Sequence, residues 1–137
     1  MNDFKNFNWV KARKQCSLSW AFAQLRSDLQ KDVERRNELR KPMYPNDPPL
    51  YAFGFKLQQS ENQIVILREG ISRVFQQTVF TLKDDAIEME AKDKPNMVVK
   101  VGLNDSGVCA LYLNGEERES WLIRKLALDD LFFGIAD

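Results

Sequence analysis

The hydrophobic positions of the chain follow a helical period at first and a strand period afterwards. Between residues 18 and 33, large apolar side chains recur every three or four residues, which is the spacing of one face of an α-helix. This stripe consists of Leu18, Phe22, Leu25, Leu29 and Val33. From Leu50 onward, apolar and polar residues alternate instead, as they do in strands with one buried face. The pattern predicts an α+β fold.

Two N-terminal helices are expected before the sheet. Asn8 can cap a short first helix, and Ser17 or Ser19 can cap the second, because their side-chain oxygens accept hydrogen bonds from the first free backbone N–H groups. The second helix should end near Lys41, since Pro42 cannot continue it. A further, strongly apolar segment near the end of the chain predicts a C-terminal helix.

Between these helices, the alternating pattern predicts an antiparallel β-meander sheet of about six or seven strands, because short strands are joined by short polar loops. The expected strands cover residues 51–58, 64–67, 73–82, 87–90, 97–103, 109–113 and 116–119. Core and charge patterns then predict the facing pairs Met89–Val99, Glu88–Lys100 and Leu103–Cys109.

A chain of 137 residues is expected to form a single domain. We divide it into a helical front (1–41), a Pro-rich connector (42–49), the antiparallel sheet (50–119) and the C-terminal helix (120–135). The connector is too short to separate two domains convincingly.

Composition narrows the class of protein. A hydrophobic fraction of 44% is typical of a folded domain. No apolar run approaches the roughly 20 residues that span a bilayer, and the first residues lack a signal-peptide pattern, so we expect a cytoplasmic protein without a membrane partner. Cys16 and Cys109 are the only cysteines, and we interpret both as buried thiols in a reducing compartment.

The charge pattern argues against nucleic acid as a partner. Residues 1–41 hold ten Lys or Arg against five Asp or Glu, and the chain as a whole is neutral. This asymmetry is mild, and no aromatic residue interleaves with the basic cluster of Arg35, Arg36, Arg40 and Lys41, as single-strand binding would favour.

The sequence also lacks the usual catalytic motifs. It contains no histidine, which removes the commonest general base and metal ligand, and its scattered glycines form no phosphate-binding loop. Pairs of carboxylates, such as Asp84 with Asp85 and Glu88 with Glu90, are best interpreted as solvated charges. We therefore assign no catalytic, cofactor-binding or metal-binding residue, expect no cofactor, and lean against an enzyme.

Surplus apolar residues suggest a first functional hypothesis: a non-enzymatic protein-interaction module that forms a homodimer or binds a protein partner. A domain of two layers leaves some of these residues uncovered. The expected interface residues are Phe75, Val79, Trp121, Leu128 and Phe132. The competing interpretation is that the first helix covers the second sheet face and makes three layers.

A second hypothesis is a carrier of a small apolar ligand. The aromatic row Tyr51, Phe53 and Phe55 alternates along the first expected strand and can line a cavity between the long helix and the sheet. The same row can equally belong to the core, because the long helix must bury its own stripe. The sequence leaves both hypotheses open.

Overall fold

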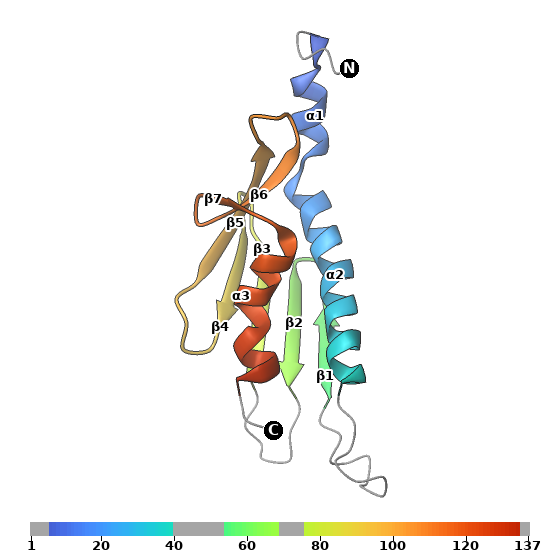
Figure 1. Ribbon diagram of the computed structural model, residues 1–137, viewed down its shortest axis with the longest axis vertical. Coiled ribbons are helices and arrows are strands. Elements are labelled where there is room, and N and C mark those ends of the chain that lie inside the picture. The colour runs from blue at the N-terminus through green and yellow to red at the C-terminus, as the bar shows by residue number, and fades with distance from the viewer. Residues whose placement is uncertain (1–5, 40–53, 69–75, 135–137) are drawn as a thin grey trace, which may run out of the picture.

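A computed structural model describes residues 6–39, 54–68 and 76–134 of the chain. It has the predicted α+β fold, with two N-terminal helices, seven antiparallel strands and a C-terminal helix (Figure 1). The elements are α1 (Trp9–Gln15), α2 (Leu18–Glu38), β1 (Phe55–Gln59), β2 (Gln63–Arg68), β3 (Gln76–Leu82), β4 (Ile87–Ala91), β5 (Met97–Leu103), β6 (Cys109–Leu113), β7 (Glu116–Arg118) and α3 (Ser120–Phe133).

Both N-terminal helices begin at the predicted caps. The Asn8 side chain accepts a hydrogen bond from the Lys11 N–H, and the Ser17 hydroxyl accepts one from the Trp20 N–H. Helix α2 ends at Glu38, slightly before the predicted end. The expected connector, 42–49, lies outside the described residues.

The sheet is a meander in which each strand pairs with the next along the chain, in the order β1 to β7. The predicted register between β5 and β6 is confirmed, because Leu103 lies opposite Cys109. Between β3 and β4, Phe80 lies opposite Met89. One buried face therefore runs across the middle of the sheet.

The register between β4 and β5 differs from the prediction by two residues. Met89 lies opposite Met97 instead of Val99. Residues 90–96 connect this facing pair, instead of the expected 92–96, and within them the Lys94 N–H donates to the Ala91 carbonyl at 3.3 Å. A two-residue shift leaves every side chain on the same face, so the hydrophobic pattern cannot detect it.

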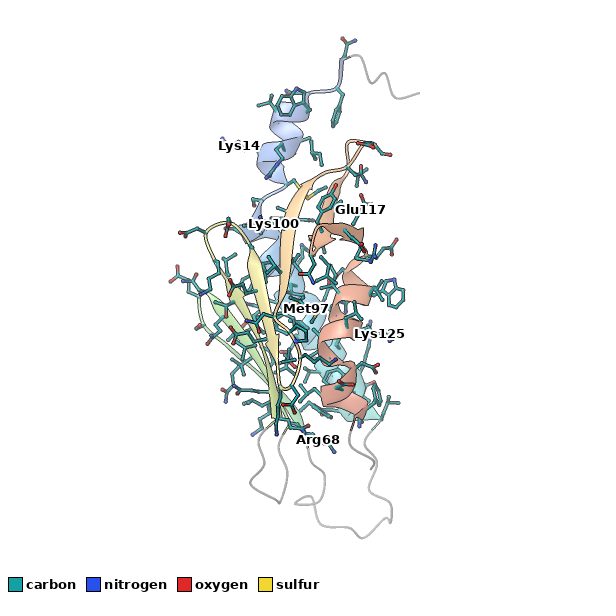
Figure 2. The ribbon with its side chains drawn as sticks, turned by 90° about the vertical axis from the view of Figure 1, so that its left-hand side faces the viewer. Lys14, Arg68, Met97, Lys100, Glu117 and Lys125 are labelled. Atoms are coloured by element: carbon teal, nitrogen blue, oxygen red, sulfur yellow. A yellow bond between two sulfur atoms is a disulfide. The ribbon has the colours of Figure 1, made fainter. Side chains whose placement is uncertain are left out.

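Helices α2 and α3 pack on the same face of the sheet, which gives a two-layer domain (Figures 1 and 2). The Thr78 hydroxyl of β3 donates to the Ala127 carbonyl of α3 at 3.2 Å and ties the layers together. The centre of the core contains Phe22, Leu29, Ile64, Ile66, Phe80, Met89, Ile123 and Leu131.

The second face of the sheet is not covered by α1, so the three-layer interpretation is wrong for the described part of the chain. Helix α1 extends past the end of the sheet and buries none of its residues (Figure 1). Half-buried Val79 lies on the face opposite α2 and α3, between Val65 of β2 and Glu90 of β4.

The end of α2 is joined to the edge strand β1 by one side-chain amide. The Asn37 Nδ2 donates to the Phe55 carbonyl at 2.9 Å, and the Phe55 N–H donates to Asn37 Oδ1 at 2.8 Å. The Asn37 amide therefore provides hydrogen-bond partners for both the backbone N–H and the backbone carbonyl of Phe55, the first residue of β1.

None of the described helices is long and apolar enough to span a membrane.

Candidate functional site

A disulfide anchors the two N-terminal helices to the sheet. Cys16, at the end of α1, is bonded to Cys109, the first residue of β6, across 93 residues of sequence. The prediction that both cysteines are free thiols is therefore wrong. Alternation of the β6 side chains turns Cys109 toward the helix layer, where the junction between α1 and α2 places the almost fully buried Cys16.

Beside this disulfide lies a cavity of about 550 Å³ between α2, β6, β7 and the start of α3. We call it the α2–β6 cavity. Its apolar wall includes Trp20, Leu25, Ile87, Val99, Leu111 and Ile123. Its polar lining includes Gln24, Asp28, Asn104, Glu119 and Ser120. An apolar wall with a few polar groups is the usual composition of a small-molecule site.

The charged side chains that line the α2–β6 cavity differ in whether they have ion-pair or hydrogen-bond partners. Arg118 forms an ion pair with Glu116 and donates a hydrogen bond from Nη1 to the Glu117 carbonyl at 2.8 Å. By contrast, within the described residues, no ion pair or hydrogen bond engages the side chain of Asp28 or Glu119. The cavity lining therefore offers free carboxylate acceptors, while its one arginine is already paired.

Of the aromatic row expected to line a ligand cavity, the structure describes only Phe55. Tyr51 and Phe53 lie outside the described residues. Phe55 is 3% exposed and packs edge-to-face on Phe132, with ring centroids 4.8 Å apart. Phe55 is thus a core residue near the end of α2, whereas the α2–β6 cavity adjoins the beginning of that helix.

The expected interface residues are partly brought together. Trp121, Leu128 and Phe132 all line a groove of about 260 Å³ between α2 and α3, which we call the α2–α3 groove. Only Trp121 is exposed, at 57%, because Leu128 and Phe132 are buried and form the apolar floor of this groove. Val79 lies on the sheet face opposite α2 and α3, and Phe75 lies outside the described residues.

One end of the α2–α3 groove is built around a buried arginine. Arg36 is 5% exposed, and its Nε donates to the Phe132 carbonyl at 2.9 Å. Its guanidinium also lies 5.0 Å from the ring centre of Phe55 and 4.8 Å from that of Phe133. Arg36 belongs to the basic cluster noted in the sequence, but hydrogen bonding and two aromatic rings stabilise its charge inside the protein.

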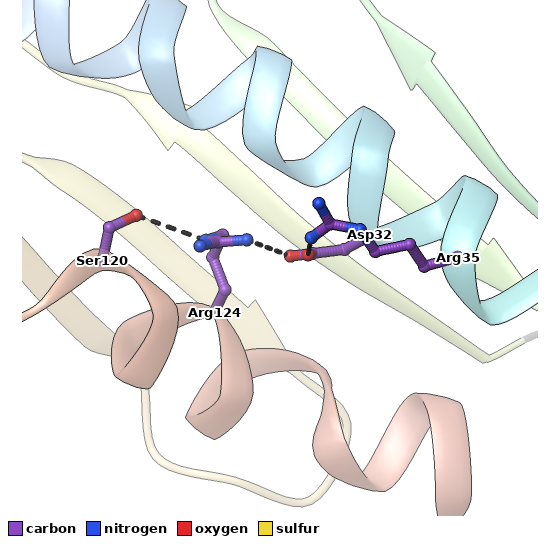
Figure 3. A network of polar contacts seen from close by, with 4 residues as sticks. All are labelled: Asp32, Arg35, Ser120 and Arg124. Atoms are coloured by element: carbon purple, nitrogen blue, oxygen red, sulfur yellow. Dashed lines mark hydrogen bonds and ion pairs between the residues drawn. The ribbon is translucent and has the colours of Figure 1, made fainter.

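The middle of the α2–α3 groove is closed by an ion pair between the two helices. Arg124 Nη1 donates to Asp32 Oδ2 at 2.6 Å, and Arg124 Nε donates to the Ser120 hydroxyl at 3.2 Å (Figure 3). Arg35 approaches the same carboxylate from solvent at 3.9 Å. The pair fixes the spacing of the helices that line both the groove and the cavity.

The remaining carboxylate pairs do not gather into a reactive centre. Glu88 lies opposite Val98 and not Lys100, which is the two-residue shift described above. Asp130 pairs with Lys94 at 3.0 Å. Among the described residues, no cluster of three or more Asp, Glu or Cys side chains is arranged to hold a metal ion.

No protein-family model matches the chain, and no curated protein or solved structure matches it either.

Proposed function

We propose that the protein binds a small molecule with an apolar body in the α2–β6 cavity, and that the polar end of this molecule is a hydrogen-bond donor. The observation that carries the proposal is the cavity itself. Its volume of about 550 Å³ lies within the range of known ligand pockets, and its wall is mainly apolar. Transfer of an apolar body from water into this space supplies the driving force.

The free carboxylates favour a donor over an acceptor at the polar end. Asp28 and Glu119 present negative charge to the cavity, and Arg118 is already paired with Glu116. A ligand carboxylate would meet repulsion here, whereas a hydroxyl or ammonium group would gain a hydrogen bond. Trp20, which is half exposed and also lines the cavity, adds an aromatic face that attracts a cation.

The first test measures the binding of Nile red, an uncharged apolar dye that fluoresces in apolar surroundings. In Ala21→Leu, the added side chain enters the cavity, because Ala21 is a buried lining residue. Ala23→Leu is the matched control, since Ala23 is an exposed residue of the same helix outside the cavity. We expect saturable dye binding that weakens at least about tenfold in Ala21→Leu only, which corresponds to about 1.4 kcal/mol. Equal binding by all three proteins would refute the site.

The second test addresses the polar end. Decylamine, decanol and decanoate carry the same chain and differ in the head group, and each is used to displace the dye. We expect decanoate to be the weakest, and Asp28→Asn to reduce the advantage of decylamine about two- to fivefold, as the loss of one partly exposed charge pair predicts. Asp129→Asn, on the outer side of α3, should leave the ranking unchanged. A preference for decanoate would contradict the proposed head group.

A further inference from the structure

Helix α3 carries a row of four exposed residues spaced by four: Trp121, Lys125, Asp129 and Phe133. The two aromatic residues are 57% and 59% exposed, and the two charged side chains are 54% and 49% exposed. Lys125 lies on the side of α3 that faces away from the sheet (Figure 2). We call these residues the α3 row. Large aromatic residues at both ends of an exposed row are typical of an interaction surface.

The α3 row is complementary to an antiparallel copy of itself. Each aromatic residue then lies opposite an aromatic residue, and each charge lies opposite a charge of the other sign. If two copies of α3 meet antiparallel, with a twofold axis through the middle of the exposed row at the level of Ala127 along the helix, Trp121 of one copy lies opposite Phe133 of the other. Lys125 then lies opposite Asp129, twice. A twofold interface requires such self-complementarity, because each contact occurs in both directions. We propose that the α3 row binds a second copy of this chain, independently of the α2–β6 cavity.

The surroundings of the row fit this occupant. Residues spaced by four form a ridge, and two such ridges pack together at about −50°, the commonest helix crossing in globular proteins. The C-terminal end of the α2–α3 groove holds Leu39, 70% exposed, beside Phe133. An antiparallel partner brings its Trp121 to this apolar corner.

The charges add specificity to the contact. Lys125 and Asp129 of one copy lie 3.5 Å apart and form an exposed ion pair, which by itself contributes little to stability. In the dimer each charge gains a second partner, so four alternating charges form a network at the centre. Because a single helix pair buries a small area, the dimer should be weak and sensitive to salt.

Sedimentation equilibrium of the full chain over a range of micromolar concentrations tests the proposal. Wild type should dimerise, and Lys125→Asp or Asp129→Lys alone should weaken the dimer about tenfold or more, because like charges then face each other. An equimolar mixture of the two variants should restore a heterodimer. The controls Lys83→Asp and Asp84→Lys make the same changes in net charge in the exposed turn after β3.

Three results would overturn the inference. The first is a monomeric wild type, the second is a dimer that either row variant leaves intact, and the third is a mixture that stays monomeric. All four substituted positions are exposed, so the variants should keep the wild-type circular dichroism spectrum.

Discussion

The Arg124 guanidinium of α3 lies 2.6 Å from the Asp32 carboxylate of α2, and both side chains are less than one-fifth exposed. Because this pair is partly shielded from water, each charge depends on the other for its stabilisation. We expect Asp32→Asn to lower the free energy of unfolding by about 1–3 kcal/mol. Arg35→Ala should change it by less than about 0.5 kcal/mol, because that guanidinium is 72% exposed and 3.9 Å away. Urea unfolding measures both changes. Equal losses of unfolding free energy in the two variants would show that the Asp32–Arg124 pair contributes no more than the exposed Arg35 contact.

The disulfide gives a prediction about both thiol content and stability. A thiol reagent should find no free cysteine in the unreduced protein, even after unfolding, and two after reduction. Replacing both Cys16 and Cys109 by Ala should lower the free energy of unfolding by about 2–4 kcal/mol, because the bond closes a long loop. Detection of two thiols without reductant would contradict the bond.

The long helical stripe gives a prediction about the core. Leu29 is fully buried under the sheet, whereas Leu25 is only partly buried and lines the α2–β6 cavity. Leu29→Ala should therefore cost about 2–5 kcal/mol of stability, and Leu25→Ala should cost clearly less. Thermal and urea melts of both variants test this order. A greater loss in Leu25→Ala would mean that α2 packs on the sheet by a different face.

The amide of Asn37 gives a prediction about the first strand. Asn37→Asp removes the donor to the Phe55 carbonyl and places a carboxylate beside it, while Asn37→Gln keeps the amide but displaces it. We expect Asn37→Asp to destabilise the protein by about 1–3 kcal/mol, since a peptide group loses its partner. Hydrogen exchange at the Phe55 N–H should instead accelerate in Asn37→Gln, in which the acceptor oxygen is displaced, because the carboxylate of Asn37→Asp can still accept this hydrogen bond. Unchanged exchange would show that the amide does not hold the strand.

Local patterns predicted the fold because the spacing of the apolar residues matches the repeat of the helix or strand that buries them. The stripe from Leu18 to Val33 has no other way to bury its side chains than one helix face, and alternation fixes which face of each strand is buried. The register of β4 on β5 escaped prediction because a shift by two residues preserves the faces. The turn that sets it depends on backbone hydrogen bonds near Lys94, which the hydrophobic pattern does not encode.

The candidate sites were harder to predict, because they depend on residues far apart in the sequence. Trp121, Leu128 and Phe132 line one groove, but helical spacing could not tell that two of them would be buried. Likewise, nothing local joins Cys16 to Cys109, and the expected compartment argued against their bond. Their core-facing positions were the one available signal.

The Asn37 amide also bears on how the protein avoids unwanted assembly. β1 is one edge of the sheet, and an edge strand with free peptide groups is a template for strands of other molecules. At Phe55 both outward groups already bond the amide, so an incoming chain would have to displace Asn37 before adding in register there. The other edge, β7, is only three residues long, and two of these are glutamates. The paired peptide groups at the start of β1 and the short, acidic β7 therefore both disfavour the addition of a foreign strand at the borders of the sheet.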